Sequence, residues 1–175
     1  MDEVQVVSLV RNGNTEAFAD IVDQYQFPIS RYIKRLTGDD EVTKDLAQDT
    51  FLNAYEGILK TDSELSLKAW LYRIATNNVL QYKRRKRLIS FIPFVEYKKQ
   101  DNLSVDTKDL DNRMQIEEVF LKVPDSQRVC LALHYIEGFH YREIANILGI
   151  SEDAVRMRVV RGSKEFQRLY KQGGG

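Results

Sequence analysis

The chain has 175 residues, of which 43% are hydrophobic and 30% charged, with 9 glycines and 3 prolines. This composition predicts a globular protein of one ordinary domain or two small ones, and the scarcity of glycine and proline favours long helices with few tight turns. A single cysteine excludes an intrachain disulfide, and the most apolar stretch, residues 88–95, is too short to span a membrane. Because the first residues also lack the apolar core of a signal peptide, we expect a cytoplasmic protein without membrane insertion.

The formal net charge is zero, but the charges are segregated along the chain. Residues 37–64 contain eight acidic and two basic side chains, whereas residues 83–87 are five consecutive bases. Two partners of opposite character explain this pattern better than one.

Helical periodicity runs through almost the whole sequence, which predicts an all-α fold. Thr15 is expected to cap the second helix, and Pro28 is expected to kink or break it. The first four helices are assigned to one domain, residues 1–90; the first ends at residues 12–14, and the others cover residues 15–36, 41–60 and 65–87.

Residues 91–112 are expected to be a linker to a second, smaller helical domain, residues 113–175. The apolar stretch 88–95 has two open interpretations: it packs against a domain, or it docks on a partner. In the second domain, one helix begins near Arg113 and ends at Pro124, and Ser126 is expected to cap the next helix. The fold class is therefore two small helical domains joined by a linker.

The strongest signal is a helix-turn-helix over residues 141–162. Ala145 is small enough for a second helix to cross closely, Gly149 can adopt the left-handed turn, and Ser151 can cap the second helix. Apolar side chains of this second helix fall on one side, and basic ones face away: Arg156, Arg161, Lys164, Arg168 and Lys171, with Arg158 on the flank. Such a helix fits the major groove of DNA. The alternative is a helical hairpin whose basic face is only solvated.

The fourth helix is expected to turn a basic face outward, which favours phosphate contacts. The side chains placed on that outward face are Tyr72, Arg73, Thr76, Lys83, Arg84 and Arg87. Trp70 and Tyr72 could stack on unpaired bases, although Trp70 also suits the core. The third helix carries the opposite surface, with Asp45, Gln48, Asp49 and Glu56 on one polar face that suits a basic protein groove.

With an acidic helix, a basic helix, a linker and a helix-turn-helix in that order, residues 18–169 resemble the extracytoplasmic-function (ECF) group of bacterial RNA polymerase sigma factors. Residues 45–51 resemble the family's core-binding motif in region 2.2, and residues 70–77 with the basic run resemble regions 2.3 and 2.4, which melt and read the −10 element. Residues 124–128, 137–138 and 141–145 resemble region 4, which reads the −35 element.

The resemblance implies a role for each of three sets of residues. Core polymerase would bind through its β′ clamp to Asp45, Gln48, Asp49, Asn53 and Glu56. The −10 DNA would contact Trp70, Arg73, Asn77, Lys83, Arg84 and Arg87, with the loop at residues 61–66 holding a flipped base. The −35 DNA would contact Ser151, Asp153, Arg156, Arg158, Arg161 and Lys164.

The implied partners are core polymerase at its β′ clamp and β flap, promoter DNA, and an anti-sigma protein of the kind that commonly holds such factors inactive. No cofactor, metal or catalytic residue is expected. The chain departs from the family pattern where the recognition helix begins, because Asp153 and Ala154 replace the usual Gly-Thr, which points to an altered −35 specificity.

Three other classes of protein are alternatives to a sigma factor. A two-domain regulator with a helical sensor would not need the acidic helix beside a basic one. A zinc-binding anti-sigma protein needs several Cys and His ligands, which a single cysteine excludes. An enzyme would depend on Cys130, His134, His140 and Glu143, but nothing in the sequence orients them as a ligand set or a triad.

Overall fold

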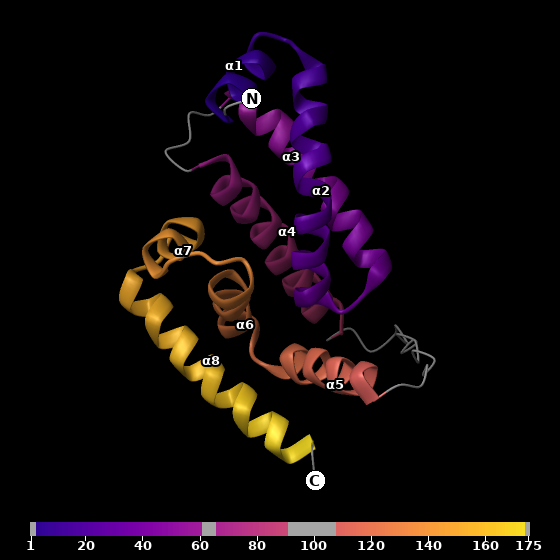
Figure 1. Cartoon of the computed structure of the whole chain (residues 1–175), viewed down its shortest axis with the longest axis vertical. Coiled ribbons are helices and arrows are strands. Elements are labelled where there is room, and N and C mark those ends of the chain that lie inside the picture. The colour runs from indigo at the N-terminus through magenta and orange to yellow at the C-terminus, as the bar shows by residue number, and fades with distance from the viewer. Residues whose placement is uncertain (1–2, 61–65, 91–107, 174–175) are drawn as a thin grey trace.

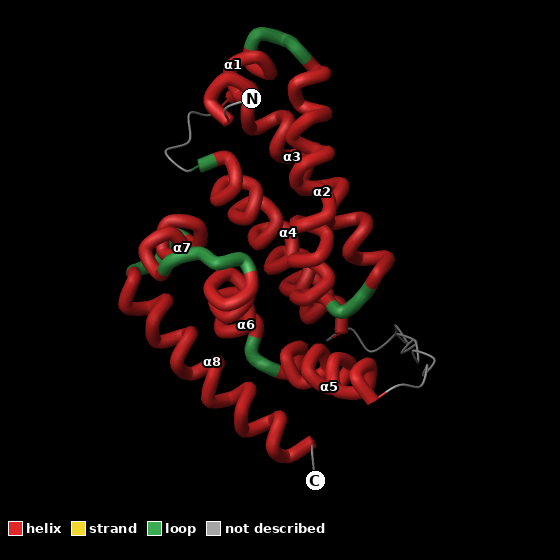
Figure 2. Tube along the Cα trace, viewed as in Figure 1, coloured by secondary structure: helices red, strands yellow, loops and turns green. Residues whose placement is uncertain are grey.

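The computed structural model describes residues 3–60, 66–90 and 108–173, with side chains in the last range from residue 112. The described residues are helices joined by short loops and contain no strand, which confirms the all-α expectation (Figure 2). Figure 1 shows two groups of helices side by side. Among the described residues, no helix is both long enough and apolar enough to cross a membrane.

The first group contains α1 (Glu3–Arg11), α2 (Thr15–Thr37), α3 (Asp40–Lys60) and α4 (Leu67–Ser90). Helices α2, α3 and α4 pack against one another, and α1 packs against α2 and α3 at the end of the bundle opposite the α2–α3 loop (Figure 1). Ile29, Ile33 and Leu71 are fully buried between them. Burial of this apolar surface is the main source of stability for such a bundle.

The structure corrects the expected cap of α2 and excludes the break expected at Pro28. The N-cap is Asn14 rather than Thr15, because the Asn14 side-chain oxygen accepts a hydrogen bond from the Ala17 amide at 3.2 Å. The helix also runs through Pro28 without a break. Pro28 leaves the Gln24 carbonyl without its helical donor, but Gln24 is exposed, so water can donate to that carbonyl instead.

The second group begins with α5 (Lys108–Lys122), so this helix starts earlier than the expected position near Arg113. Next come α6 (Asp125–Leu131), its π-helical continuation η1 (Ala132–Ile136), α7 (Tyr141–Leu148) and α8 (Glu152–Gly173). The expectation that Ser126 caps α6 was wrong: Pro124 holds the N-cap position and Asp125 is the first helical residue. Helix α8 packs against α5, α6 and α7 and so connects the helices of this group.

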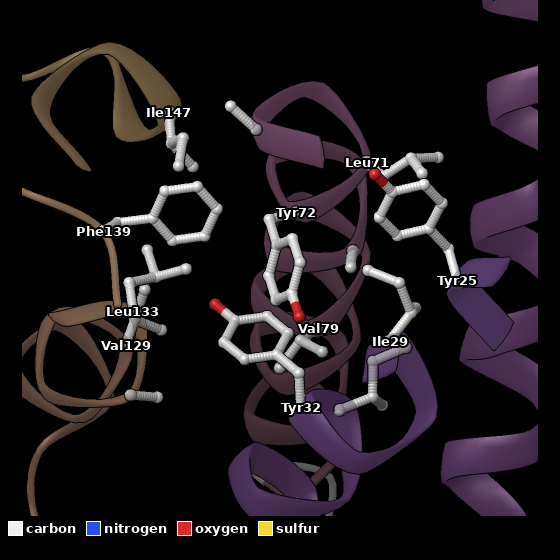
Figure 3. Close-up of a cluster of buried hydrophobic side chains, with 14 of the residues drawn as sticks. Tyr25, Ile29, Tyr32, Leu71, Tyr72, Val79, Val129, Leu133, Phe139 and Ile147 are labelled. Atoms are coloured by element: carbon white, nitrogen blue, oxygen red, sulfur yellow. The ribbon is translucent and has the colours of Figure 1, made fainter. Parts of the chain in front are cut away.

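The two groups share one hydrophobic core instead of standing apart. Tyr72 of α4 lies between α2 on one side and the second group on the other (Figure 3). Its ring meets Tyr32 and Phe139 edge-on, with ring centroids 5.0 and 5.3 Å apart. This contact contradicts the outward placement of Tyr72 and Thr76, which are each 1% exposed. The second group covers the side of α4 that the first group leaves open.

Most of the apolar stretch 88–95 lies outside the described residues, as does the loop at residues 61–65. Leu88 and Ile89 belong to the end of α4 and are exposed.

Candidate protein and nucleic-acid interfaces

The helix-turn-helix predicted from the sequence is present in α7 and α8. Gly149 ends α7 with φ 65°, and its amide donates to the Ala145 carbonyl. Ser151 caps α8, because its hydroxyl oxygen accepts from the Ala154 amide at 3.1 Å. Ile144 and Val155 are fully buried where the two helices cross. The local signals in the sequence therefore define the motif correctly.

The outer face of α8 carries the basic side chains expected for DNA. Arg156, Arg161 and Lys164 are exposed, as is Asp153 in the first turn. Arg158 is half-buried and lies beside the Cys130 thiol, away from the other basic side chains of α8. Ser151 is exposed, but its hydroxyl oxygen serves as the cap.

Two apolar side chains on the same face were missed in the sequence. Met157 is 50% exposed and Val160 is 46% exposed. At about 100° per residue they fall between Arg156 and Arg161, in line with Asp153 and Lys164. The signal was available, because neither residue fits the inward stripe of Val155, Val159 and Gly162.

The residues predicted to bind −10 DNA separate into two sets on α4. Arg73, Asn77 and Arg84 are exposed on one side of the helix. Lys83 and Arg87 lie on another side, where both pair with Asp125 of α6, at 2.7 and 3.8 Å.

Trp70 is half-buried and belongs to the packing of α3 against α4. A Cβ atom at Gly57 of α3 would come within 2.8 Å of Cζ2 of the Trp70 ring, so the two helices approach closely here. The expectation that Trp70 suits the core agrees with this contact, and part of the ring remains accessible.

The acidic face of α3 is fully accessible. Asp45, Gln48, Asp49, Asn53 and Glu56 are all exposed, as expected for a surface that binds a protein. Leu52, which is 56% exposed, lies among them and was missed in the sequence. An apolar side chain surrounded by polar ones is typical of a protein-binding surface.

A small polar network connects this acidic face to α4. The Asn53 amide donates to Oδ1 of Asn78 at 3.2 Å, and the Asn78 amide donates to the buried Thr50 hydroxyl at 3.2 Å. The Thr50 hydroxyl in turn donates to the Leu46 carbonyl at 2.6 Å. Asn53 therefore also fixes the position of α3 relative to the basic helix.

An apolar groove of about 1120 Å³ lies between α2 and the second group of helices. Its apolar lining includes Ile116, Tyr135 and Ile136, each more than 40% exposed. Its α2 side is basic, with Arg31, Lys34 and Arg35.

The residues considered for an enzyme have structural roles. The Glu143 carboxylate accepts from the His140 amide at 2.7 Å at the start of α7, and His134 Nδ1 lies 2.9 Å from the Phe139 carbonyl oxygen. Burial raises the pKa of the Cys130 thiol to about 11, so this thiol is a poor nucleophile at neutral pH. Among the described residues, no group of three or more His, Cys, Asp or Glu side chains could hold a metal ion.

A recognition helix, a basic helix and an acidic face on one helical chain define a DNA-binding protein that also has a surface for a protein partner. Residues 21–89 match the family model for sigma-70 region 2, and residues 113–166 match the model for sigma-70 region 4. The chain is 30% identical to the ECF RNA polymerase sigma factor SigW of Bacillus subtilis over 175 residues, covering 93% of each protein. It is 27% identical to the RNA polymerase sigma-H factor of Pseudomonas aeruginosa, covering 94% of this chain and 91% of that one. The chain therefore belongs to the ECF sigma factors of the sigma-70 family.

Solved structures share the fold. The structure of CnrH in complex with the cytosolic domain of CnrY has a TM-score of 0.73 at 21% identity and covers 97% of each chain. The sigma factor RpoE of Bartonella quintana, solved with the anti-sigma factor NepR, has a TM-score of 0.70 at 24% identity, covering 88% of this chain and 96% of that one.

Proposed function

We propose that this chain is the promoter-specificity subunit of RNA polymerase, and that it directs initiation by binding core polymerase and recognising −10 and −35 elements. The observation that carries the proposal is the presence of three accessible surfaces on one chain of this family. They are the acidic face of α3, the exposed basic side chains of α4 and the outer face of α8. The chemistry of RNA synthesis belongs to the polymerase.

Core polymerase is assigned to two surfaces. The β′ clamp contacts Asp45, Gln48 and Asp49, with Asn53, Glu56 and the exposed Leu52 extending the same face of α3. The β flap contacts the second half, where the exposed side chains of Ile116, Tyr135 and Ile136 provide apolar surface.

The −10 element is assigned to α4, with Arg73, Asn77 and Arg84 accessible and Lys83 and Arg87 available once they leave Asp125. The exposed part of the Trp70 ring offers a stacking surface for an unpaired base.

The −35 element is assigned to the outer face of α8. Arg156, Arg161 and Lys164 bind guanine edges or phosphates, with Ser151 and Arg158 at the margin of the face. Asp153 can accept from the amino group of cytosine, and the methyl groups of thymine suit Met157 and Val160.

An anti-sigma protein is the proposed regulator, since RpoE was solved with the anti-sigma factor NepR, and CnrH with the cytosolic domain of CnrY. A two-domain regulator with a helical sensor remains the second candidate only if core polymerase does not bind.

The test is run-off transcription by purified core polymerase on the DNA upstream of the chain's own gene. A transcript that needs both this chain and the upstream DNA is expected; a template with that region scrambled is the control. Failure to bind core polymerase at sub-micromolar concentration in a pull-down would overturn the proposal in favour of the regulator.

A further inference from the structure

Helix α1 binds the two helix ends between which the chain passes from α3 to α4. Near the end of α1, the Arg11 Nε donates to the Ile58 carbonyl of α3 at 3.0 Å. At the start of α1, the Glu3 carboxylate accepts from the Leu67 amide of α4 at 3.3 Å, and its other oxygen accepts from the Tyr25 hydroxyl at 3.0 Å. Two side chains of one helix therefore hold the end of α3 and the start of α4.

Both contacts match the chemistry of helix ends. The last carbonyls of a helix and its first amides lack partners within the helix, and they carry partial negative and partial positive charge. Arg11 places a cation at the last turn of α3, and Glu3 places an anion at the first turn of α4, which has no acidic residue of its own. The Ser66 hydroxyl oxygen accepts from the Ala69 amide at 3.2 Å, so Ser66 and Glu3 bind different amides of the same turn.

The rest of the first bundle keeps Glu3 in a fixed position. Val6 and Val10 of α1 are buried in the core, at 8% and 1% exposed. Tyr25 is buried as well, and burial together with the neighbouring Glu3 carboxylate raises the pKa of its phenol to about 12. Tyr25 therefore remains a hydrogen-bond donor to Glu3 at neutral pH. Helix α1 precedes residues 21–89, so the match to sigma-70 region 2 does not include it.

The helix ends held by α1 lie beside the Trp70 ring. Ile58 follows Gly57, which faces this ring across the contact of α3 with α4, and Leu67 lies one turn before Trp70. The exposed part of the ring is the stacking surface assigned to an unpaired −10 base. A shift of the start of α4 relative to the end of α3 would therefore displace the ring from that base.

We propose that Glu3 and Arg11 are positioning residues for −10 recognition, which hold the start of α4 against the end of α3 and thereby fix the Trp70 ring where an unpaired base stacks. The inference rests on the proposed function for the identity of the DNA. Neither side chain needs to touch DNA in this role, because both act through the two helix ends. Loss of either contact should lower the preference for the correct −10 sequence and leave the affinity for −35 DNA unchanged.

The first test measures base discrimination by the full chain in complex with purified core polymerase. Discrimination is the ratio of two affinities, one for a single strand carrying the −10 element of the active promoter and one for the same strand with its −10 bases shuffled. Glu3→Ala and Arg11→Ala should each lower this ratio about fivefold, the factor by which loss of a helix cap typically changes an equilibrium. The two substitutions change the net charge in opposite directions, so an effect of charge on phosphate binding would have opposite signs in the two variants.

Glu3→Gln is the matched control for Glu3→Ala. It removes the same charge but retains a side-chain oxygen that can accept from the Leu67 amide, so its ratio should lie closer to that of the parent. Gln5→Ala, at an exposed position of the same helix, should leave the ratio unchanged. The affinity for a −35 duplex should stay the same in every variant, and the urea midpoint establishes that each variant is folded.

The second test needs no polymerase. Trp70 is the single tryptophan of the sequence, so acrylamide quenching of its fluorescence in the full chain measures access to the ring. Glu3→Ala and Arg11→Ala should each increase the quenching constant, because the start of α4 is no longer held against α3. Gln5→Ala should leave it at the value of the parent.

Unchanged ratios in both alanine variants, or ratios that move in opposite directions, would overturn the positioning role. An equal loss of discrimination for Glu3→Gln and Glu3→Ala would also overturn it, because charge alone would then explain the effect. If core polymerase does not bind the parent, the proposed function fails. The quenching constants then decide by themselves whether α1 fixes the start of α4, and unchanged values in both alanine variants overturn that as well.

Discussion

Gly57 has no side chain, and the Trp70 ring fills the space next to it. Glycine inside an exposed helix is unfavourable by about 1 kcal/mol relative to alanine. Gly57 is nonetheless suited to α3, because the Trp70 ring of α4 occupies the space where a Cβ atom would lie, 2.8 Å from Cζ2. The contact lets α3 and α4 pack closely next to the accessible acidic face.

Gly57→Ala is expected to lower the stability despite the better helix propensity of alanine. Displacing a packed ring typically costs about 1–3 kcal/mol, which exceeds the propensity gain. Trp70 is the single tryptophan of the sequence, so its fluorescence reports on the ring directly. A red-shifted emission and a lower urea midpoint are expected. Gly173→Ala, where the new Cβ would meet its nearest neighbour at 3.7 Å, is the control. A raised midpoint for Gly57→Ala would show that the ring moves freely.

Apart from helix caps, the residues that the sequence placed wrongly lie at the contact between the two halves. Periodicity assigns to the core those side chains of α4 that face α2 and α3, and Leu71 and Ala75 are indeed buried there. Tyr72 and Thr76 both contact Tyr32 of α2, and the Phe139 segment of the second group packs against the other side of the Tyr72 ring. Arg128, a charged residue only 5% exposed, could not be distinguished from a surface arginine for the same reason.

The helix-turn-helix was predictable because its determinants are close together in the sequence. A small residue, a turn glycine and a cap follow one another within residues 145–151, and each acts on its immediate neighbours. Helix ends were less predictable where two cap candidates are adjacent. Asn14 and Thr15 can both cap α2, and the sequence does not decide between them.

Gly149→Ala should destabilise the second half through the backbone alone. Gly149 has φ 65°, and no atom lies within 4 Å of the position that a Cβ would take. The left-handed conformation destabilises an alanine by roughly 1–2 kcal/mol. A clash of the new Cβ with neighbouring side chains adds nothing to this cost. The measurement is the midpoint of urea unfolding, monitored by circular dichroism.

Gly149→Asn is the matched control for this position. Asparagine tolerates the left-handed region better than alanine, so its midpoint should lie between those of the parent and Gly149→Ala. Equal losses for the two variants would mean that the space around the turn, rather than φ, sets the cost.

At the scale of the whole molecule, the two surfaces assigned to protein and duplex DNA lie far apart. Helix α3 belongs to the first group and α8 to the second, and Figure 1 shows them on opposite sides of the molecule. The sequence predicted both groups of helices and the order of the surfaces along the chain. It did not predict how the groups dock, since the contacts join residues such as Leu36 and Arg128 that are 92 positions apart. Nothing local in the sequence marks such a pair.

The separation of these surfaces predicts that their functions can be lost independently. Asp49→Ala should weaken binding to core polymerase by about 1–2 kcal/mol, as for a central polar contact, and leave the affinity for a −35 duplex unchanged. Arg161→Ala should have the reverse effect, with a loss of about 1–3 kcal/mol for the duplex, because an arginine contact to a base edge is worth that much.

Both affinities are measured by titration with purified core polymerase and with a duplex carrying the −35 element of the active promoter. Asp23→Ala, at an exposed position on α2, and Arg168→Ala, whose guanidinium is held by Glu165 at 2.6 and 2.9 Å, are the matched controls. If either Asp49→Ala or Arg161→Ala lowered both affinities equally with an unchanged urea midpoint, the two surfaces would be coupled, and their assignment to separate partners would be wrong.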